Sequence, residues 1–146
     1  MITSTIIKDV QTELSEKLGT LLVGDALPGK AMYAYRTLPG DLAVEIGITH
    51  MGSRNEDNVT GGDGYSILYS VFVFAQHLND AETLELAENA LGEIESLILY
   101  GLDQADDALY TGDNYDYLKF EWSMRPPAPR DVPNVRHGLI YLRAYI

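Results

Sequence analysis

The stretch Gly64–Tyr100, GYSILYSVFVFAQHLNDAETLELAENALGEIESLILY, decides the fold of this chain. Its first part, Tyr65–Ala75, is rich in β-branched and aromatic residues and places apolar side chains on both faces of an extended strand. Such a strand is expected near the centre of a sheet, covered on at least one side. Apolar residues then recur every three or four positions, which predicts an amphipathic helix over Asp80–Leu99, capped by Asn79 or Asp80. A central strand with a helix packed back onto it is the expected nucleus.

Outside this stretch the sequence predicts one more helix and four more strands. An amphipathic helix over Ser4–Leu18 is expected to begin after a cap at Thr3 or Ser4 and to end at Gly19. The further strands are predicted over Ala31–Leu38, Leu42–His50, Tyr117–Met124 and Gly138–Ile146. Together these patterns predict one α+β domain over residues 1–146, with a mainly antiparallel sheet, two helices packed on it and the order α-β-β-β-α-β-β.

Three segments lack a clear periodic pattern. Met51–Gly64 is polar and rich in glycine and asparagine, so we expect an exposed, poorly ordered loop that becomes ordered against a partner. Asp103–Asp116 is acidic and gets no assignment. Four prolines are expected to keep Arg125–Asn134 extended and irregular. In the predicted core, Phe72 and Leu91 are expected to be positions where truncation to alanine is costly.

Composition narrows the classes of function. The 146 residues include no cysteine, which excludes disulfides and thiolate chemistry and fits a protein made in a reducing cytosol. The sequence has neither a run long enough to span a membrane nor a signal-peptide pattern. A net charge of −12 makes the chain a poor binder of nucleic acid. The basic residues are unevenly placed, because none lies between Arg54 and Lys119 and five of the ten lie from Lys119 onward. Complementary charged surfaces or simple solubility explain this asymmetry.

No catalytic signature is present in the sequence: it has no Walker loop, no G-x-G-x-x-G, no H-E-x-x-H and no G-x-S-x-G. Two acidic clusters are candidate cation sites, but neither follows the calcium-loop pattern, so solvated loops are favoured over a metal site. We therefore expect no catalytic residue, no metal and no cofactor. The acidic clusters consist of Asp57, Asn58, Thr60 and Asp63, and of Asp103, Asp106, Asp107, Asp113 and Asp116.

Ten tyrosines give more amphipathic aromatic surface than a small core requires. Tyrosine is enriched at protein–protein interfaces because it offers contact area with little loss of rotamer freedom. Half-buried sheet positions account for most of these residues, but we expect a few of them to contact another subunit.

The order of elements resembles the tail-terminator proteins of tailed bacteriophages. The similarity lies in the N-terminal helix TSTIIKDVQTELSEKLG, the strand DLAVEIGITH, the unit GYSILYSVFVFAQHLNDAETLELAENALGEIESLI and the closing GLIYLRAYI. It extends over nearly the whole chain as architecture, without a shared motif. The resemblance implies a structural protein of the virion, assembled in the host cytoplasm as a hexameric ring. Such a ring ends the tail tube, joins it to a head-side neck protein and leaves a central channel for DNA.

In such a ring, residues of the polar segment and the C-terminal arginines are candidates for contact with a neighbouring subunit or the tube. Arg143 is a further candidate for a positive surface opposite the carboxylates of Glu56–Asp116. Two alternatives stay open: another neck protein, such as a head-closure or connector subunit, and a small soluble ligand-binding or hydrolytic α+β domain. The contact candidates are Arg54, Glu56, Asp57, Asn58, Asp63, Arg125, Arg130 and Arg136.

Overall fold

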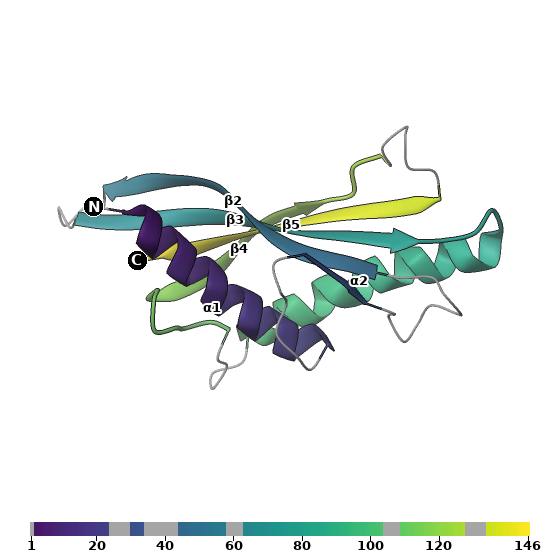
Figure 1. Cartoon of the computed structure of the whole chain (residues 1–146), viewed down its shortest axis with the longest axis horizontal. Coiled ribbons are helices and arrows are strands. Elements are labelled where there is room, and N and C mark those ends of the chain that lie inside the picture. The colour runs from purple at the N-terminus through teal and green to yellow at the C-terminus, as the bar shows by residue number, and fades with distance from the viewer. Residues whose placement is uncertain (1, 24–29, 34–43, 58–62, 104–108, 128–133) are drawn as a thin grey trace.

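The structure, a computed structural model of the chain, describes residues 2–23, 30–33, 44–57, 63–103, 109–127 and 134–146. Its element order, α-β-β-β-α-β-β, confirms the predicted α+β class (Figure 1). The helices and strands are α1 (Ser4–Val23), β1 (Lys30–Tyr33), β2 (Val44–Asp57), β3 (Asp63–Gln76), α2 (Ala81–Asp103), β4 (Tyr117–Met124) and β5 (Val135–Tyr145).

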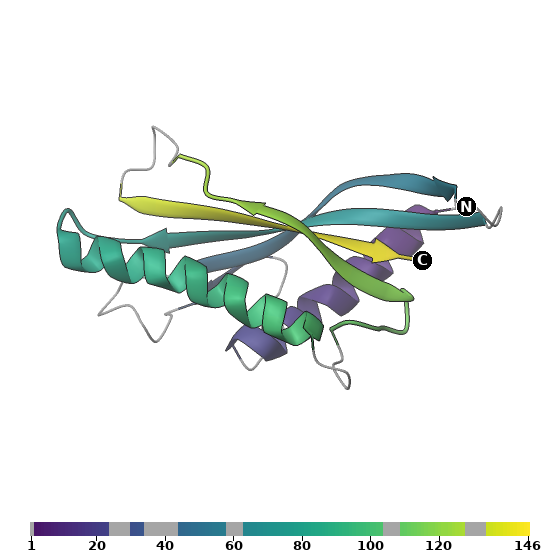
Figure 2. The same cartoon turned by 180° about the vertical axis from the view of Figure 1, so that it is seen from behind.

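The five strands form one antiparallel sheet in the order β1-β2-β3-β5-β4. β3 is its middle strand, which confirms the central place predicted for Tyr65–Ala75. Both helices lie on the same side of this strongly twisted sheet (Figures 1 and 2). We call this side the covered face, carried in β3 by Ile67, Tyr69 and Val71, and the opposite side the open face, carried in β3 by Ser70, Phe72 and Phe74.

The hydrophobic core lies between the covered face and the two helices. From α1 it takes Val10, Leu14 and Leu18, and from α2 the stripe that includes Leu91 and Ile94. Helix and sheet approach closely where α2 crosses β5. The strand residues that complete the core include Ile46, Ile48, Ile67, Val71, Val73, Leu118, Ile140 and Leu142.

Two helix caps agree with the sequence, and one helix end does not. Thr3 Oγ1 accepts a hydrogen bond from the Ile6 amide at 3.2 Å, and Asp80 Oδ1 accepts one from the Thr83 amide at 2.7 Å. The prediction that α1 ends at Gly19 is wrong, because the helix continues to Val23. Leu22 extends the buried stripe by one further turn, and this packing outweighs the low helix propensity of one glycine.

The predicted loop Met51–Gly64 is mostly strand. β2 continues through Met51 to Asp57 and pairs with Asp63–Leu68 of β3, so the segment forms a long hairpin, with residues 58–62 outside the described parts. A β-bulge between His50 and Gly52 shifts the register and breaks the two-residue alternation that marks a strand. Polar residues are tolerated here because the described part of β1 pairs with β2 at Val44–Gly47, so no described strand lies along the outer edge of β2 beyond Gly47. The prediction of surface exposure holds, since Met51, Ser53, Arg54 and Asn55 are exposed.

The C-terminal strands match their predictions closely. β4 has the predicted bounds, with a bulge between Phe120 and Trp122. β5 begins at Val135, three residues before the predicted Gly138. β1 is the start of the predicted strand Ala31–Leu38, whose remainder lies outside the described residues, as does much of the proline-rich segment. Neither described helix has the length and apolarity needed to cross a membrane.

Candidate functional site

The open face carries rows of apolar and aromatic side chains that no described element covers. In the register of β3 and β5, Phe72 lies opposite Leu139, and Phe74 lies opposite His137. Phe72 was expected in the core and is buried, with 8% of its surface exposed, but it lies on this face and outside the cluster that packs against the helices. Since a sheet face in water is ordinarily polar, an uncovered apolar face indicates a binding surface.

Aromatic rings stack across neighbouring strands along this face. Such stacked pairs stabilise the sheet beyond the burial of apolar area, because the rings are attracted to one another through their quadrupoles. They also hold each ring in place, so the surface is rigid before any partner arrives. The stacked pairs are Phe74 with His137 at 4.2 Å between centroids, Trp122 with Tyr141 at 4.3 Å and Tyr117 with Tyr145 at 4.5 Å.

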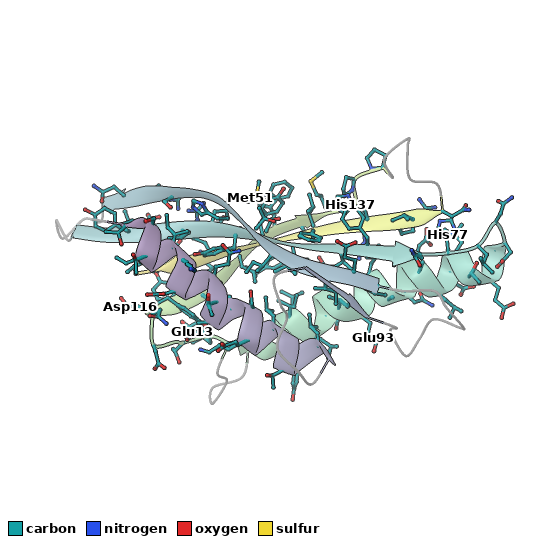
Figure 3. The ribbon with its side chains drawn as sticks, viewed as in Figure 1. Glu13, Met51, His77, Glu93, Asp116 and His137 are labelled. Carbon is teal, nitrogen blue, oxygen red and sulfur yellow. The ribbon has the colours of Figure 1, made fainter. Side chains whose placement is uncertain are left out.

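A shallow hollow of about 360 Å³ lies in the middle of the open face. Figure 3 shows Met51 and His137 on this side of the sheet, away from both helices. Most of its wall is apolar, and four lining residues also carry a polar group, the pattern of a surface that binds an apolar side chain with a polar tip. The hollow is lined by Thr49, Met51, Ser70, Phe72, Phe74, His137, Leu139 and Tyr141.

His137 is the polar group of this hollow that lacks a partner. Its Nε2 atom is buried and has no hydrogen-bond partner among the described residues. Burial lowers the pKa of the His137 imidazole below its ordinary value, so the ring is neutral at pH 7. A neutral imidazole has one nitrogen that accepts a hydrogen bond. The hollow is therefore lined by a histidine whose Nε2 atom is buried and unsatisfied.

Next to the hollow, the open face has a polar end. Arg143, which is buried, donates a hydrogen bond from Nη1 to Ser66 Oγ at 3.0 Å and pairs with Glu121. Ser66 Oγ in turn donates to Glu56 Oε1 at 2.6 Å, and Glu56 also pairs with Arg54. Charge is balanced within this network, which links side chains from β2, β3, β4 and β5. It fixes the neighbouring strands rather than leaving free charge.

The predicted contact residues fall into three places. Arg54 and Glu56 belong to the polar end of the open face. Arg125 and Arg136 contact α2 of their own chain, through Glu95 at 3.7 Å and Glu88 at 3.3 Å, so they are not free cations.

The acidic predicted residues lie at the tip of the hairpin. Asp57 and Asp63 are paired strand residues there. Asn58 and Arg130 lie outside the described residues. The structure thus brings Arg54 and Glu56 together with Arg143, and places Arg125 and Arg136 beside α2.

The hollow was missed by sequence reasoning. One signal was present in the sequence, because two-residue alternation places His137, Leu139 and Tyr141 on the same side of β5. The same alternation places Thr49 on the corresponding side of β2. Nothing in the alternation says which side the helices cover, so this signal alone does not separate open-face residues from core residues.

A clasp at the edge of the covered side holds the segment before β4. The Glu13 carboxylate accepts hydrogen bonds from the Asp113 amide at 3.0 Å and the Asn114 amide at 2.9 Å. Burial alone would raise the pKa of Glu13, but hydrogen bonds from Lys17, Asn114 and Asp113 outweigh it and lower that pKa. A Cβ atom at Gly112 would overlap the Glu13 carboxylate and the Tyr115 ring, so a larger residue there would displace them from this close approach.

The clasped segment reaches the outer edge of β4. Lys17 Nζ donates to the Thr111 carbonyl at 2.8 Å, and the Tyr115 hydroxyl donates to the Leu109 carbonyl at 2.7 Å. The Tyr110 carbonyl accepts a hydrogen bond from the Leu118 amide at 2.8 Å, so one outward amide of β4 is already satisfied. These bonds order part of Asp103–Asp116, which the sequence left unassigned.

Within the described parts of the chain, no group of three or more His, Asp or Glu side chains is placed to hold a metal ion. In the second acidic cluster, the Asp113 and Asp116 amides donate to Glu13 and to the Tyr145 carbonyl, while residues 104–108 are not described.

Comparison with known proteins adds no family assignment. No protein-family model matches the chain, and no curated protein matches its sequence.

Proposed function

We propose that this chain is a structural subunit that works by assembling into a ring, in the manner of a bacteriophage tail terminator, and that it is not an enzyme. The observation that carries the proposal is the uncovered aromatic face of the sheet, with its hollow between β2, β3 and β5. The α-β-β-β-α-β-β order is the one on which the resemblance to tail terminators rests. On this proposal the ring belongs to the tail and neck of a virion and contacts a tail tube protein and a head-side neck protein.

The distribution of charge favours the open face as the surface where copies meet. The chain carries a net charge of −12, so two copies repel each other in most orientations. Among the strand side chains that the structure describes, the open face is balanced, because it holds three basic and three acidic residues. Two acidic chains therefore approach there at a lower electrostatic cost than at the acidic α2. The six charged residues of the open face are Arg54, Lys119, Arg143, Glu45, Glu56 and Glu121.

A ring of such subunits could surround a DNA channel without binding the DNA tightly. Attraction to phosphates requires clustered Lys and Arg, and two of the arginines outside the open face, Arg125 and Arg136, already contact glutamates. Exposed ion pairs contribute about 0–1 kcal/mol each, so assembly rests on apolar and aromatic contacts, and charge sets their register.

Light scattering coupled to gel filtration over a range of concentrations, followed by electron microscopy, tests the proposal. We expect a ring of about six subunits, the size the family resemblance implies, in equilibrium with smaller species. Trp122→Glu is expected to shift the chain to monomer while leaving it folded, because Trp122 is 48% exposed on β4. Leu78→Glu is the matched control, since Leu78 is 55% exposed outside the open face and should tolerate the same change.

A strict monomer at every concentration that also fails to bind the ends of tail tubes would overturn the proposal. The second candidate would then lead: a small-molecule site in the hollow, whose volume lies at the small end of the range for ligand pockets. In that case a panel of small aromatic compounds should protect the monomer against thermal unfolding, and Thr49→Arg should abolish the protection.

A further inference from the structure

A closed ring needs two different surfaces on each subunit. In a cyclic assembly the contact is heterologous, so the surface on one copy meets a different surface on the next copy. The open face supplies one of the two surfaces. The inference below rests on the proposed function, because it asks which part of a neighbouring copy fills the hollow.

The apolar side chains exposed on the described residues leave few candidates for the second surface. Met51, Trp122 and Met124 belong to the open face, and Tyr110 and Tyr117 contact each other at its edge. The remaining exposed large side chains are Leu78, before α2, and the adjacent pair Leu99 and Tyr100 at the end of α2.

The pair at the end of α2 projects away from its own sheet. Ile98 is fully buried in the core, and Tyr100, two residues further along the helix, is 61% exposed. Because consecutive helix residues are about 100° apart, Tyr100 points to the side opposite Ile98. Figure 2 shows this end of α2 lying beneath the sheet, on the side away from the open face. A neighbouring copy can therefore reach Tyr100 without disturbing the core.

A tyrosine side chain is complementary to the hollow in both shape and polarity. Its ring is apolar and packs on Phe72 and Leu139, and its hydroxyl donates a hydrogen bond. The buried Nε2 of His137 is an acceptor without a partner when the imidazole is neutral with its proton on Nδ1. A tyrosine in the hollow would fill the space between the rings, and its hydroxyl would satisfy this buried atom once the His137 ring turned towards it.

Charge supports a second copy as the source of that tyrosine. The sequence of α2 contains acidic residues and no Lys or Arg. Such a helix is repelled by any acidic surface of another copy, but not by the balanced open face, where Lys119 is exposed. The carboxylate of Glu93, about two helical turns before Tyr100, lies on the helix side of the sheet (Figure 3).

We infer that Tyr100, with Leu99 beside it, inserts into the open-face hollow of the next copy and donates a hydrogen bond to His137 of that copy. Each subunit then offers a tyrosine at one end and a hollow at the other. A chain of such contacts continues from copy to copy until the ring closes.

Two variants that each remove one half of the contact provide the test. Tyr100→Ala keeps the hollow but loses the inserted side chain, and we expect the concentration for half assembly to rise about 30-fold or more, as for an interface hot spot. Thr49→Arg keeps Tyr100 and fills the hollow from Thr49, which is exposed and so tolerates the change. Each variant alone should be monomeric at concentrations where the wild type forms rings.

Mixing the two variants distinguishes a heterologous contact from other arrangements. The Thr49→Arg chain still has its tyrosine and the Tyr100→Ala chain still has its hollow, so an equimolar mixture should form a one-to-one pair and stop there. Tyr100→Phe should weaken assembly about two- to tenfold, the expected loss for one hydrogen bond. Leu78→Ala is the control and should assemble like wild type.

The outcomes separate the two proposals. If the wild type forms rings and Tyr100→Ala forms them equally well, the inference is overturned and the ring proposal stands. A mixture that remains monomeric beside a wild type that assembles also overturns the inference. If the wild type never assembles, the proposed function fails first, and the inference fails with it. Far-ultraviolet circular dichroism and thermal unfolding of each variant show whether it is folded.

Discussion

The two faces of this sheet are made of similar residue types but serve different ends. On the covered face, β3 presents Ile67, Tyr69 and Val71 to the two helices, and these side chains are fully buried. On the open face, the same strand presents Phe72 and Phe74 to a hollow that no described element fills. The covered face thus stabilises the single chain, whereas the open face leaves apolar surface uncovered by any described element, and we propose that a partner binds there. Mutations on the covered face should therefore change mainly the free energy of unfolding, and mutations on the open face should change mainly assembly.

The difference is also visible in how polar groups are treated. On the covered face, the Tyr69 hydroxyl donates to the Ile7 carbonyl of α1 at 2.6 Å, and burial raises the pKa of that hydroxyl. On the open face, His137 Nε2 is buried without a hydrogen bond among the described residues. Unsatisfied buried groups cost free energy and are rare in finished interiors. The other such atom in the described parts of the chain, Arg136 Nε, lies on the covered side in a side chain that pairs with Glu88, whereas His137 Nε2 belongs to the face that no described element covers.

The largest effect on stability is expected from the covered face. Leu91 is 3% exposed, and its side chain packs where α2 approaches Gly138 of β5. Leu91→Ala should lower the free energy of unfolding by about 2–5 kcal/mol, because a cavity remains between helix and sheet. Urea denaturation measures this. Leu99→Ala, in the same helix but exposed, serves as control, and an equal loss in both variants would contradict the assigned core.

The clasp between α1 and the segment before β4 should give the next largest effect. Glu13→Gln replaces a charged acceptor of several hydrogen bonds and should cost about 1–3 kcal/mol at pH 7. The pKa of Glu13 is lowered in the folded chain, so its contribution is present above the unfolded pKa of about 4.3 and is lost as pH falls through the folded value.

The difference between wild type and Glu13→Gln should therefore shrink in urea melts below about pH 4. Glu16→Gln is the control, because Glu16 is exposed on the same helix. A variant difference that stays constant from pH 7 to pH 3 would mean that the ionised carboxylate does not hold the clasp.

On the open face, truncation should affect the single chain only modestly. Trp122→Ala removes a ring stacked on Tyr141 and should lower the free energy of unfolding by about 0.5–1.5 kcal/mol, measured in the monomer at low concentration. The same variant should strongly reduce assembly. A loss of stability as large as that of Leu91→Ala would show that the open face belongs to the core, and the distinction between the two faces would fail.

The smallest effect is expected where the arginines meet α2. Arg125→Gln removes a partly exposed ion pair with Glu95 and should change the free energy of unfolding by about 0–1 kcal/mol. Thermal unfolding at low and high salt measures it. If Arg125 instead lies at a subunit contact, as the sequence indicated, the variant would weaken assembly while leaving the melting of the monomer unchanged.

The elements with undisturbed periodicity were predictable from sequence. The alternation of β3 and the stripe of α2 identified the central strand and its helix, and Tyr117–Met124 was predicted with its exact bounds. Errors occurred where a local rule was outweighed. The bulge after His50 disrupted the alternation of β2, and the packing of Leu22 carried α1 past Gly19.

The candidate site was only half predictable. Apolar side chains were predicted on both faces of the central strand, but the side covered by the helices follows from the connections between strands, not from the strand itself. Phe72 was correctly expected to be buried, but the sequence did not show that it lies on the face away from the helices. The ion pairs of Arg125 and Arg136 depend on where α2 lies against β4 and β5, and this long-range geometry leaves no local pattern in sequence.

The hydrogen bond from the Leu118 amide to the Tyr110 carbonyl has a consequence for growth of the sheet. An exposed edge strand is a template on which further chains add strand by strand, as in amyloid fibrils. Here one outward amide of β4 is occupied, and the bulge between Phe120 and Trp122 interrupts the regular spacing that an added strand would need. Both features disfavour fibril formation at the β4 edge when many copies of this acidic chain are crowded together.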